Sequence, residues 1–334
     1  MKIFISGIAG FLGSHLADRM LALGHEVTGI DSLIGGLAEN VPEAAEFGQA
    51  DCGDLDAMVK FTRGCDVVVH AACTAYEGLS VFSPHLVTQN TFQITSTLLS
   101  ASIQNSVKRF VFCSSMARYG SQEVLPFTED MVCRPQDPYG IAKYAAEKLI
   151  ENLCGVHGMQ YVICAPHNII GPRQKYNDPY RNVASIMINL MLQGRQPIIF
   201  GDGEQKRCFS FVQDCVYCIE QMALRDDLDG EVFNIGPDEE FVTINELAEV
   251  IADIMNFKLD PIYVPARPQE VSFATCSARK AREILGYKTT VNLRDGLEEL
   301  AAYIQKGGPK RFRYHLDVEI MNEQTPGVWR ERRY

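Results

Sequence analysis

The feature that most constrains the fold is an alternation of short apolar runs with helical patterns through the first half of the chain. The runs are KIFIS, HEVTGID, CDVVVHAA, KRFVFCSS and QYVICAP, rich in Val, Ile and Phe and bounded by turn residues. Strands without a polar face are buried on both sides, which is typical of a parallel sheet covered by helices. The pattern therefore predicts a doubly wound α/β fold.

The local composition of the chain changes after about residue 166. Loops lengthen and become polar and glycine-rich, as in GPRQKYNDPYRN and FGDGEQKR, and helical patterns follow over 212–224 and 244–255. We therefore predict a dinucleotide-binding domain over residues 1–166 and a smaller substrate lobe over 167–334 that closes over a ligand. We expect the two to interleave, with one or more strands of the second half returning to the first sheet.

Composition disfavours several classes of protein. Apolar residues make up 46% of the chain, and no run of about eighteen apolar residues exists that would span a membrane. The net charge of −11 disfavours nucleic acid as a partner. The N-terminus shows no basic segment followed by a long apolar stretch, so we expect a cytoplasmic protein whose eleven cysteines are reduced.

Two of these cysteines, Cys215 and Cys218, form a lone CxxC. A zinc site would require a second pair of ligands at a similar spacing, and the sequence offers none. We therefore expect no metal site and interpret the two thiols as small hydrophobic residues in the core.

A glycine loop opens the chain. Residues 7–13 read GIAGFLG, with Gly7, Gly10 and Gly13 between a predicted strand and a predicted helix. There a dinucleotide pyrophosphate meets the N-terminus of a helix, and glycine allows the close approach of backbone to phosphate. The spacing GxxGxxG differs from the commoner GxGxxG, but the strand–loop–helix context is the required one. The loop therefore predicts a Rossmann-like domain.

Carboxylates follow the next two strands. Asp31 ends the second strand, eighteen residues after Gly13. A carboxylate there accepts hydrogen bonds from the adenosine ribose and repels a 2′-phosphate, which favours NAD over NADP. The alternative, a plain turn residue, is disfavoured by this offset. Asp51, after the next short strand, is placed to reach the adenine.

A third group combines Ser115, Tyr139 and Lys143. Ser115 ends the strand KRFVFCSS, and ligands of an open parallel sheet lie beyond the carboxyl ends of its strands, so the three side chains can converge on the nicotinamide. An ammonium and an oxidised nicotinamide both lower the pKa of a phenol from about 10. The group therefore predicts a base, Tyr139, that takes an alcohol proton while a hydride leaves, with Ser115 holding the hydroxyl.

The helix that would carry the Tyr–Lys pair begins at Asp137 and Pro138, a cap and a rigid first turn. Residues four apart share a helix face, so both polar heads point the same way. On spacing alone, the alternative is a phenol and an amine on a solvated face. Apolar residues such as Ile141 are expected to hold the helix against the protein.

Taken together, these motifs make the chain similar to the extended short-chain dehydrogenase/reductase family, and within it to the nucleotide-sugar epimerases and dehydratases, UDP-glucose 4-epimerases most of all. The resemblance covers residues 1 to about 288. Its markers are GIAGFLG, Asp31, CDVVVHAAC, Asn90 in VTQNTFQ, SSMARYG, Tyr139 with Lys143, NIIGPRQ, FGDGEQKRCFSFVQD, VFNIG and ARPQEV.

The resemblance implies roles for individual residues. The catalytic group would be Ser115, Tyr139 and Lys143. NAD would be bound by Gly7, Gly10, Phe11, Leu12, Gly13, Asp31, Ser32, Asp51, Cys52, Ala71, Ala72, Asn90, Tyr139, Lys143 and His167. The nucleotide sugar would be bound by Ser115, Met116, Asn168, Asn182, Val183, Phe200, Arg207, Arg267 and Glu270. Among these, the two arginines would clamp the diphosphate, a task that suits a rigid guanidinium fork.

Some positions depart from the family pattern. Met116 and Ala117 stand where the dehydratases carry acidic residues that eliminate water, which favours epimerisation. Arg118 replaces a small apolar residue and would face either a substrate carboxylate or solvent. His167 would be structural or close to a sugar hydroxyl. Ala274 stands where the epimerases vary between Tyr and a small residue, and a small residue resembles the forms that accept N-acetylhexosamines.

The resemblance therefore implies an NAD-dependent 4-epimerase of a UDP-hexose, UDP-N-acetylhexosamine or UDP-uronate, acting through a 4-keto intermediate. A dehydratase or reductase is the first alternative, and a dinucleotide-binding sensor without turnover the second. A homodimer is expected through two long helices, over 88–104 and 138–154. The tail after Lys310, with the only Trp, has no counterpart in the resemblance.

Overall fold

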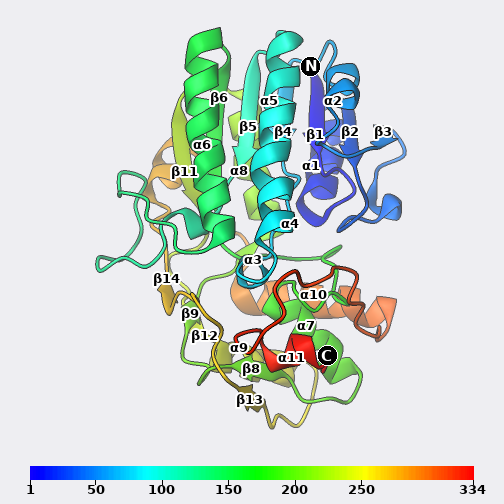
Figure 1. Ribbon diagram of the computed structural model, residues 1–334, viewed down its shortest axis with the longest axis vertical. Coiled ribbons are helices and arrows are strands. Elements are labelled where there is room, and N and C mark those ends of the chain that lie inside the picture. The colour runs from blue at the N-terminus through cyan, green and yellow to red at the C-terminus, as the bar shows by residue number, and fades with distance from the viewer.

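The computed structural model describes residues 1–334 and has a seven-stranded parallel sheet at the centre of its first lobe (Figure 1). The strand order is β11-β6-β5-β4-β1-β2-β3. The strands are β1 (Lys2–Ser6), β2 (Glu26–Asp31), β3 (Glu46–Gln49), β4 (Val67–His70), β5 (Arg109–Cys113), β6 (Gln160–Pro166) and β11 (Glu231–Ile235). The predicted Rossmann-like, doubly wound α/β fold is confirmed.

Helices cover both faces of this sheet. α1 (Phe11–Ala22) and α8 (Val212–Leu224) pack on one face, and α2 (Leu55–Phe61), α5 (Ile94–Gln104) and α6 (Pro138–His157) cover the other. Successive side chains of a strand point to opposite faces, so Val67 and Val69 join the α1–α8 layer while Val68 joins the α5–α6 layer. This explains why the strands are apolar at every position.

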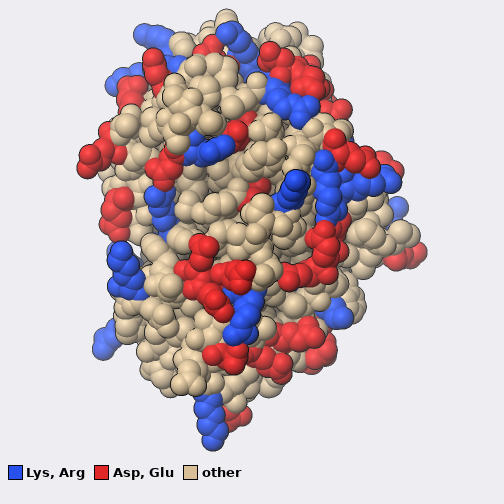
Figure 2. Space-filling model, turned by 180° about the vertical axis from the view of Figure 1, so that it is seen from behind, with Lys and Arg blue, Asp and Glu red and all other residues tan.

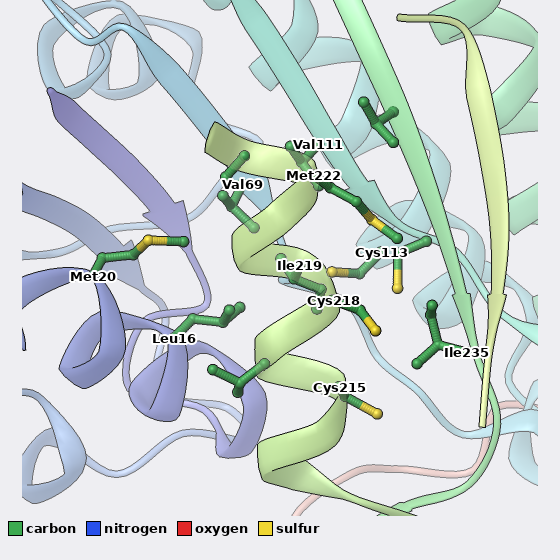
Figure 3. Close-up of a cluster of buried hydrophobic side chains, with 14 of the residues drawn as sticks. Leu16, Met20, Val69, Val111, Cys113, Cys215, Cys218, Ile219, Met222 and Ile235 are labelled. Carbon is green, nitrogen blue, oxygen red and sulfur yellow. The ribbon is translucent and has the colours of Figure 1, made fainter. Parts of the chain in front are cut away.

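The CxxC motif lies inside this core. Cys215 and Cys218 are fully buried on α8, as the interpretation of the motif as core packing predicted. Figure 3 shows their thiols on the side of α8 that faces Cys113 of β5 and Ile235 of β11. The sulfur atoms therefore act as small apolar groups that fill the space between helix and sheet.

The second lobe has a core of its own, enclosed by α7 (Val183–Leu192), α9 (Ile244–Ile254) and α10 (Leu293–Gly307). Its strands are short: β7 (Ile169–Ile170), β8 (Ile198–Phe200), β9 (Lys206–Arg207), β10 (Ser210–Phe211), β12 (Val242–Thr243), β13 (Ile262–Val264) and β14 (Phe273–Ala274). The remaining helical segments are α3 (Glu77–Ser80), α4 (Pro84–Thr88), α11 (Gly327–Arg330) and the turns Ala38–Asn40, Gln89–Gln93, Met116–Arg118 and Ala281–Leu285.

The two lobes are interleaved in sequence. β11 pairs in parallel with β6, and α8 packs against α1, so residues 212–235 lie in the first lobe although they follow residue 166. The predicted domain boundary at residue 166 stays a prediction. The central sheet continues beyond it, because β11 belongs to that sheet.

Helix α6 begins as predicted but buries a different face. The Asp137 carboxylate accepts a hydrogen bond from the Gly140 amide at 3.0 Å, and Pro138 occupies the first turn. Tyr139 and Lys143 are buried, whereas Ile141 is 52% exposed, so the expectation that Ile141 packs inward was wrong. The start of the helix lies at the carboxyl edge of the sheet, and this turns the Tyr–Lys face toward the protein.

The surface carries charges of both signs. On the face that Figure 2 shows, basic side chains are scattered among acidic ones and form no continuous basic stripe. None of the helices has the length and the apolar composition that crossing a membrane requires.

Candidate active site

A cavity of about 450 Å³ lies between the carboxyl edge of the sheet and the second lobe. Its walls include the glycine loop, the ends of β2, β4 and β5, the start of α6, and residues of α7, β8 and β9. A volume of this size is in the range of small-ligand and cofactor sites. The cavity is therefore the candidate active site, and it lies where the doubly wound topology places ligands.

The glycine loop forms the cofactor end of the cavity. Gly7 has φ +74°, and a side chain on it would place a Cβ 3.0 Å from the Ala72 backbone. A Cβ on Gly13 would lie only 2.1 Å from the Gly7 carbonyl oxygen, so the first turn of α1 can approach the loop only without a side chain. The loop therefore presents bare backbone at the N-terminus of α1, which fits a dinucleotide pyrophosphate.

Asp31 lies at the end of β2 on the same wall. Its carboxylate accepts hydrogen bonds from the amides of Leu33 at 2.7 Å and Ala9 at 3.2 Å. Burial raises the pKa of Asp31 from its usual range, and these amide bonds oppose the shift. The carboxylate is held rigidly where a ribose diol would meet it.

The predicted catalytic side chains meet next to the cofactor loop, on the wall formed by the end of β5 and the start of α6. Ser115 follows β5, and its Oγ accepts a hydrogen bond from the Ala117 amide at 3.2 Å. Lys143, which is 1% exposed, donates from Nζ to the Cys113 carbonyl at 2.6 Å. Its ammonium lies 5.8 Å from the centre of the Tyr139 ring. Two adjacent elements, the end of β5 and the first turns of α6, thus hold all three side chains.

The Tyr139 phenol is strongly influenced by burial. Burial raises its pKa well above 10, the nearby Cys73, Glu77 and Asp137 raise it further, and a hydrogen bond with Ser115 lowers it. The chain alone therefore holds Tyr139 as a neutral phenol. The additional positive charge that would lower this pKa belongs to an oxidised nicotinamide.

Arg118 takes neither of the positions expected for it. It is buried, and its Nη2 lies 3.0 Å from the Glu147 carboxylate, which also accepts a hydrogen bond from the Ser114 hydroxyl. The guanidinium packs 5.2 Å from the centre of the Tyr119 ring. Arg118 therefore faces neither solvent nor substrate, and it ties the end of β5 to α6 behind the catalytic residues.

Beyond the catalytic end, two arginines project into the cavity. Arg267 Nη2 lies 2.8 Å and Arg207 Nη2 lies 3.6 Å from the same Glu270 oxygen, and Arg267 stacks 4.9 Å from the centre of the Phe200 ring. One carboxylate thus neutralises only part of the charge of two guanidinium groups. The pair is suited to a diphosphate.

Most predicted ligand-binding residues line this single cavity. They are Gly7, Gly10, Phe11, Leu12, Gly13, Asp31, Ser32, Asp51, Cys52, Ala71, Ala72, Asn90, Ser115, Tyr139, Lys143, Asn168, Asn182, Val183, Phe200, Arg207, Arg267 and Glu270. Their roles in binding stay predictions, but the fold brings them together from both lobes.

Three positions lie elsewhere. His167 is 2% exposed, its Nε2 bonds to the Ala274 carbonyl at 2.8 Å, and it does not line the cavity, so its contact with the cofactor stays a prediction. Met116 is buried with Tyr119 and Phe127 and does not line the cavity, so its contact with the substrate stays a prediction. Ala274 does not line the cavity, so its small size opens no space beside a sugar there.

The sequence reasoning missed other wall residues. Glu77, at the start of α3, faces the cavity with a carboxylate that has no hydrogen-bond or ion-pair partner. Arg181 stacks 4.9 Å from the centre of the Tyr76 ring and pairs with Asp178. Trp329 also lies on the wall. Glu77 follows β4 in the chain, and ligands lie beyond the ends of such strands, so its sequence position could have identified it as a residue of the site.

Known proteins match both the sequence and this arrangement. Residues 3–236 match the model of the NAD dependent epimerase/dehydratase family. The UDP-glucose 4-epimerase of Mycolicibacterium smegmatis is 32% identical over 316 residues, covering 91% of this chain and 99% of that protein. Its length and that of this chain therefore correspond almost throughout.

Solved structures agree with the fold. The UDP-glucose 4-epimerase of Thermotoga maritima, with UDP-glucose, superposes with a TM-score of 0.87 at 32% identity, covering 92% of this chain and 99% of that one. The UDP-glucuronic acid 4-epimerase of Bacillus cereus, in complex with UDP-glucuronic acid and NAD, gives 0.85 at 28% identity, covering 92% and 99%. The chain belongs to the NAD-dependent epimerase/dehydratase family, and NAD is its cofactor.

Proposed function

We propose that this protein is a nucleotide-sugar 4-epimerase that acts on a UDP-sugar and keeps its NAD between turnovers. The observation that carries the proposal is the order of groups along one cavity. The cofactor cradle and Ser115, Tyr139 and Lys143 lie at one end, and the arginine pair lies farther along. The relatives named as UDP-sugar 4-epimerases support the choice of reaction and of nucleotide.

In the proposed reaction, Ser115 holds the C4 hydroxyl and the Tyr139 phenolate takes its proton. NAD, held by the glycine loop and Asp31, would supply a reversible acceptor for the C4 hydride, so that either face of the ketone could be reduced. Arg207 and Arg267 hold the diphosphate while the 4-keto sugar turns about its bond to the phosphate. Tyr139 then gives its proton back to the C4 oxygen. Lys143 acts by its field on the phenol and leaves the sugar free to turn.

We propose a neutral sugar as the substrate. A uronate would need a free cation beside the sugar, and Arg118 is already paired with Glu147. Glu77 lines the cavity, and the next residue, Gly78, packs against Arg267, so we propose that the Glu77 carboxylate lies close to the path of the sugar. A second carboxylate would be repelled there, whereas sugar hydroxyls would find an acceptor.

Glu77 also supports a second candidate, a nucleotide-sugar dehydratase. The argument against dehydration was that Met116 and Ala117 cannot shuttle a proton, but Glu77 brings an acid to the cavity from another strand end. The Glu77 carboxylate is exposed to the cavity and has no partner there, so it is the acidic group that a leaving hydroxyl would meet. The same experiment separates the two reactions.

The test is proton NMR of the purified protein with UDP-glucose, UDP-N-acetylglucosamine, UDP-glucuronate and their 4-epimers, without added cofactor. We expect a 4-epimer from a neutral sugar, reached from both directions, and none from Tyr139→Phe carrying the same NAD. A 4-keto or vinyl product would establish the dehydratase instead. Absence of any product in the presence of bound NAD would refute both and favour a sensor.

We also keep a homodimer as a proposal. α5 and α6 lie side by side (Figure 1), and Ile141 and Val156 on α6 are 52% and 69% exposed. Apolar side chains on two adjacent long helices would be covered by a second copy. Light scattering should give twice the chain mass, and Ile141→Asp should shift it toward the monomer.

A further inference from the structure

The chain after Lys310 forms a tail that lies outside the residues matched by the family model, 3–236. Figure 1 shows it in red across the front of the second lobe, with α11 near its end. Two of its residues, Trp329 and Tyr334, line the cavity beside Phe200 and Arg267. The tail is therefore part of the candidate active site and has no role in the reaction as described above.

The tail is fastened to both lobes. On the first lobe, the Glu319 carboxylate accepts hydrogen bonds from the amides of His85 at 3.0 Å and Leu86 at 2.7 Å, at the start of α4. On the second, the Asn189 side chain bonds both to the Lys310 amide, at 3.0 Å, and to its carbonyl, at 2.9 Å. A segment held at several points is a defined wall of the cavity.

Trp329 is the centre of this wall. Its ring lies 5.5 Å from Tyr180, 6.1 Å from Phe82 and 6.3 Å from Phe200, measured between ring centres. It is 3% exposed, and its indole Nε1 has no hydrogen-bond acceptor in the protein. A buried N–H without an acceptor is costly, and Trp usually finds a partner for it. The protein itself supplies no acceptor for this donor.

Tyr334 closes the wall on the side of the arginines. Its amide donates to the Tyr314 hydroxyl at 3.1 Å, and its ring packs 5.2 Å from the centre of the Phe312 ring. Tyr334 lines the cavity together with Arg267 and Glu270. Aromatic rings thus continue the cavity beyond the proposed diphosphate clamp.

The chemistry of a nucleotide sugar sets the order in which its parts meet these groups. Its sugar must lie at Tyr139, and its diphosphate at Arg207 and Arg267. The nucleoside then lies beyond the arginines, among Phe200, Trp329 and Tyr334. We propose that the tail forms the nucleobase subsite, with Trp329 packing against the base and donating its indole N–H to a base or ribose oxygen. This inference rests on the proposed function only for the direction in which the substrate lies.

Trp329 makes the test direct, because it is the only tryptophan in the chain. UDP added to the NAD-loaded enzyme should change its fluorescence. Calorimetry should show UDP binding about tenfold weaker in Trp329→Ala, and several-fold weaker in Trp329→Phe, which keeps a ring and loses the N–H. Tyr334→Ala, at a half-buried terminal position, should weaken UDP in a chain that folds normally. The control is Arg330→Ala, an exposed neighbour on α11, which should bind UDP as the wild type does.

Each result bears on the proposal without depending on turnover. UDP binding that is unchanged in Trp329→Ala and Tyr334→Ala, or binding of no nucleoside diphosphate by the wild type, would overturn it. GDP or dTDP binding that depends on Trp329, in place of UDP, would uphold the subsite and correct the nucleotide. Binding that depends on Trp329 without any sugar turnover would uphold the subsite and refute the epimerase.

Discussion

The buried pair of Arg118 and Glu147 offers the sharpest test of how the catalytic residues are held. Their side chains are 6% and 3% exposed and lie 3.0 Å apart, and Glu147 also binds the hydroxyl of Ser114, the residue before catalytic Ser115. We would replace Arg118 by Met, which keeps an apolar stem between the rings of Tyr119 and Tyr144. The substitution leaves a buried carboxylate without its cation.

Removal of one partner of a buried ion pair costs about 3–5 kcal/mol. Since about 2 °C is lost per kcal/mol in a protein of this size class, the thermal midpoint should fall by roughly 6–10 °C. Turnover should fall as well, because the pair joins the end of β5 to α6. Differential scanning calorimetry and the NMR assay measure the two effects.

The loss of stability in Arg118→Met should depend on pH. Burial already raises the pKa of Glu147, and the Arg118 charge opposes that shift, so the folded variant should have a still higher pKa at Glu147. A raised carboxyl pKa favours the protonated native state, so the native state is least penalised below the unfolded pKa of about 4.3 and loses stability as pH rises. The deficit should therefore be larger at about pH 8 than at about pH 5.5.

The matched control is the double variant Arg118→Met with Glu147→Gln. It keeps an acceptor for Ser114 but removes the stranded charge, so it should recover most of the lost stability. A single variant that loses less than about 1 kcal/mol at pH 8 would refute the reasoning. So would a double variant as unstable as the single one.

Three further sites give simpler tests. Tyr139→Phe should lower turnover about 10²–10⁴-fold and leave NAD content unchanged. In the wild type, kcat should rise between about pH 6 and 9, because burial raises the pKa of Tyr139. A flat pH profile in the NMR assay would contradict the role of Tyr139 as the base. Asp31→Asn should bring NADP affinity to within about tenfold of NAD by calorimetry, and an unchanged preference would contradict a ribose contact. Glu77→Gln should raise the turnover of UDP-glucuronate relative to UDP-glucose about tenfold, and a constant ratio would count against repulsion at that site.

Much of the candidate site follows from motifs that are short in sequence. Gly7, Gly10 and Gly13 lie in one loop, and Tyr139 and Lys143 in one helix, so spacing alone relates their positions. The face that α6 buries was not predictable in the same way. Ile141 is more apolar than Tyr139 and Lys143, yet it is exposed. The start of α6 turns the face with Tyr139 and Lys143 toward the polar cavity, and this leaves Ile141 on the outer face.

The sequence by itself determined the doubly wound sheet, the cofactor loop and the catalytic group, because each depends on contiguous patterns and on the rule that strand ends meet at one edge. Only the tertiary structure decided that Arg118 pairs with Glu147, and that Glu77 and Trp329 line the same cavity as the arginine pair. These contacts join residues far apart in the chain. Their pairing depends on how the second lobe and the tail pack, and no local period or spacing encodes that.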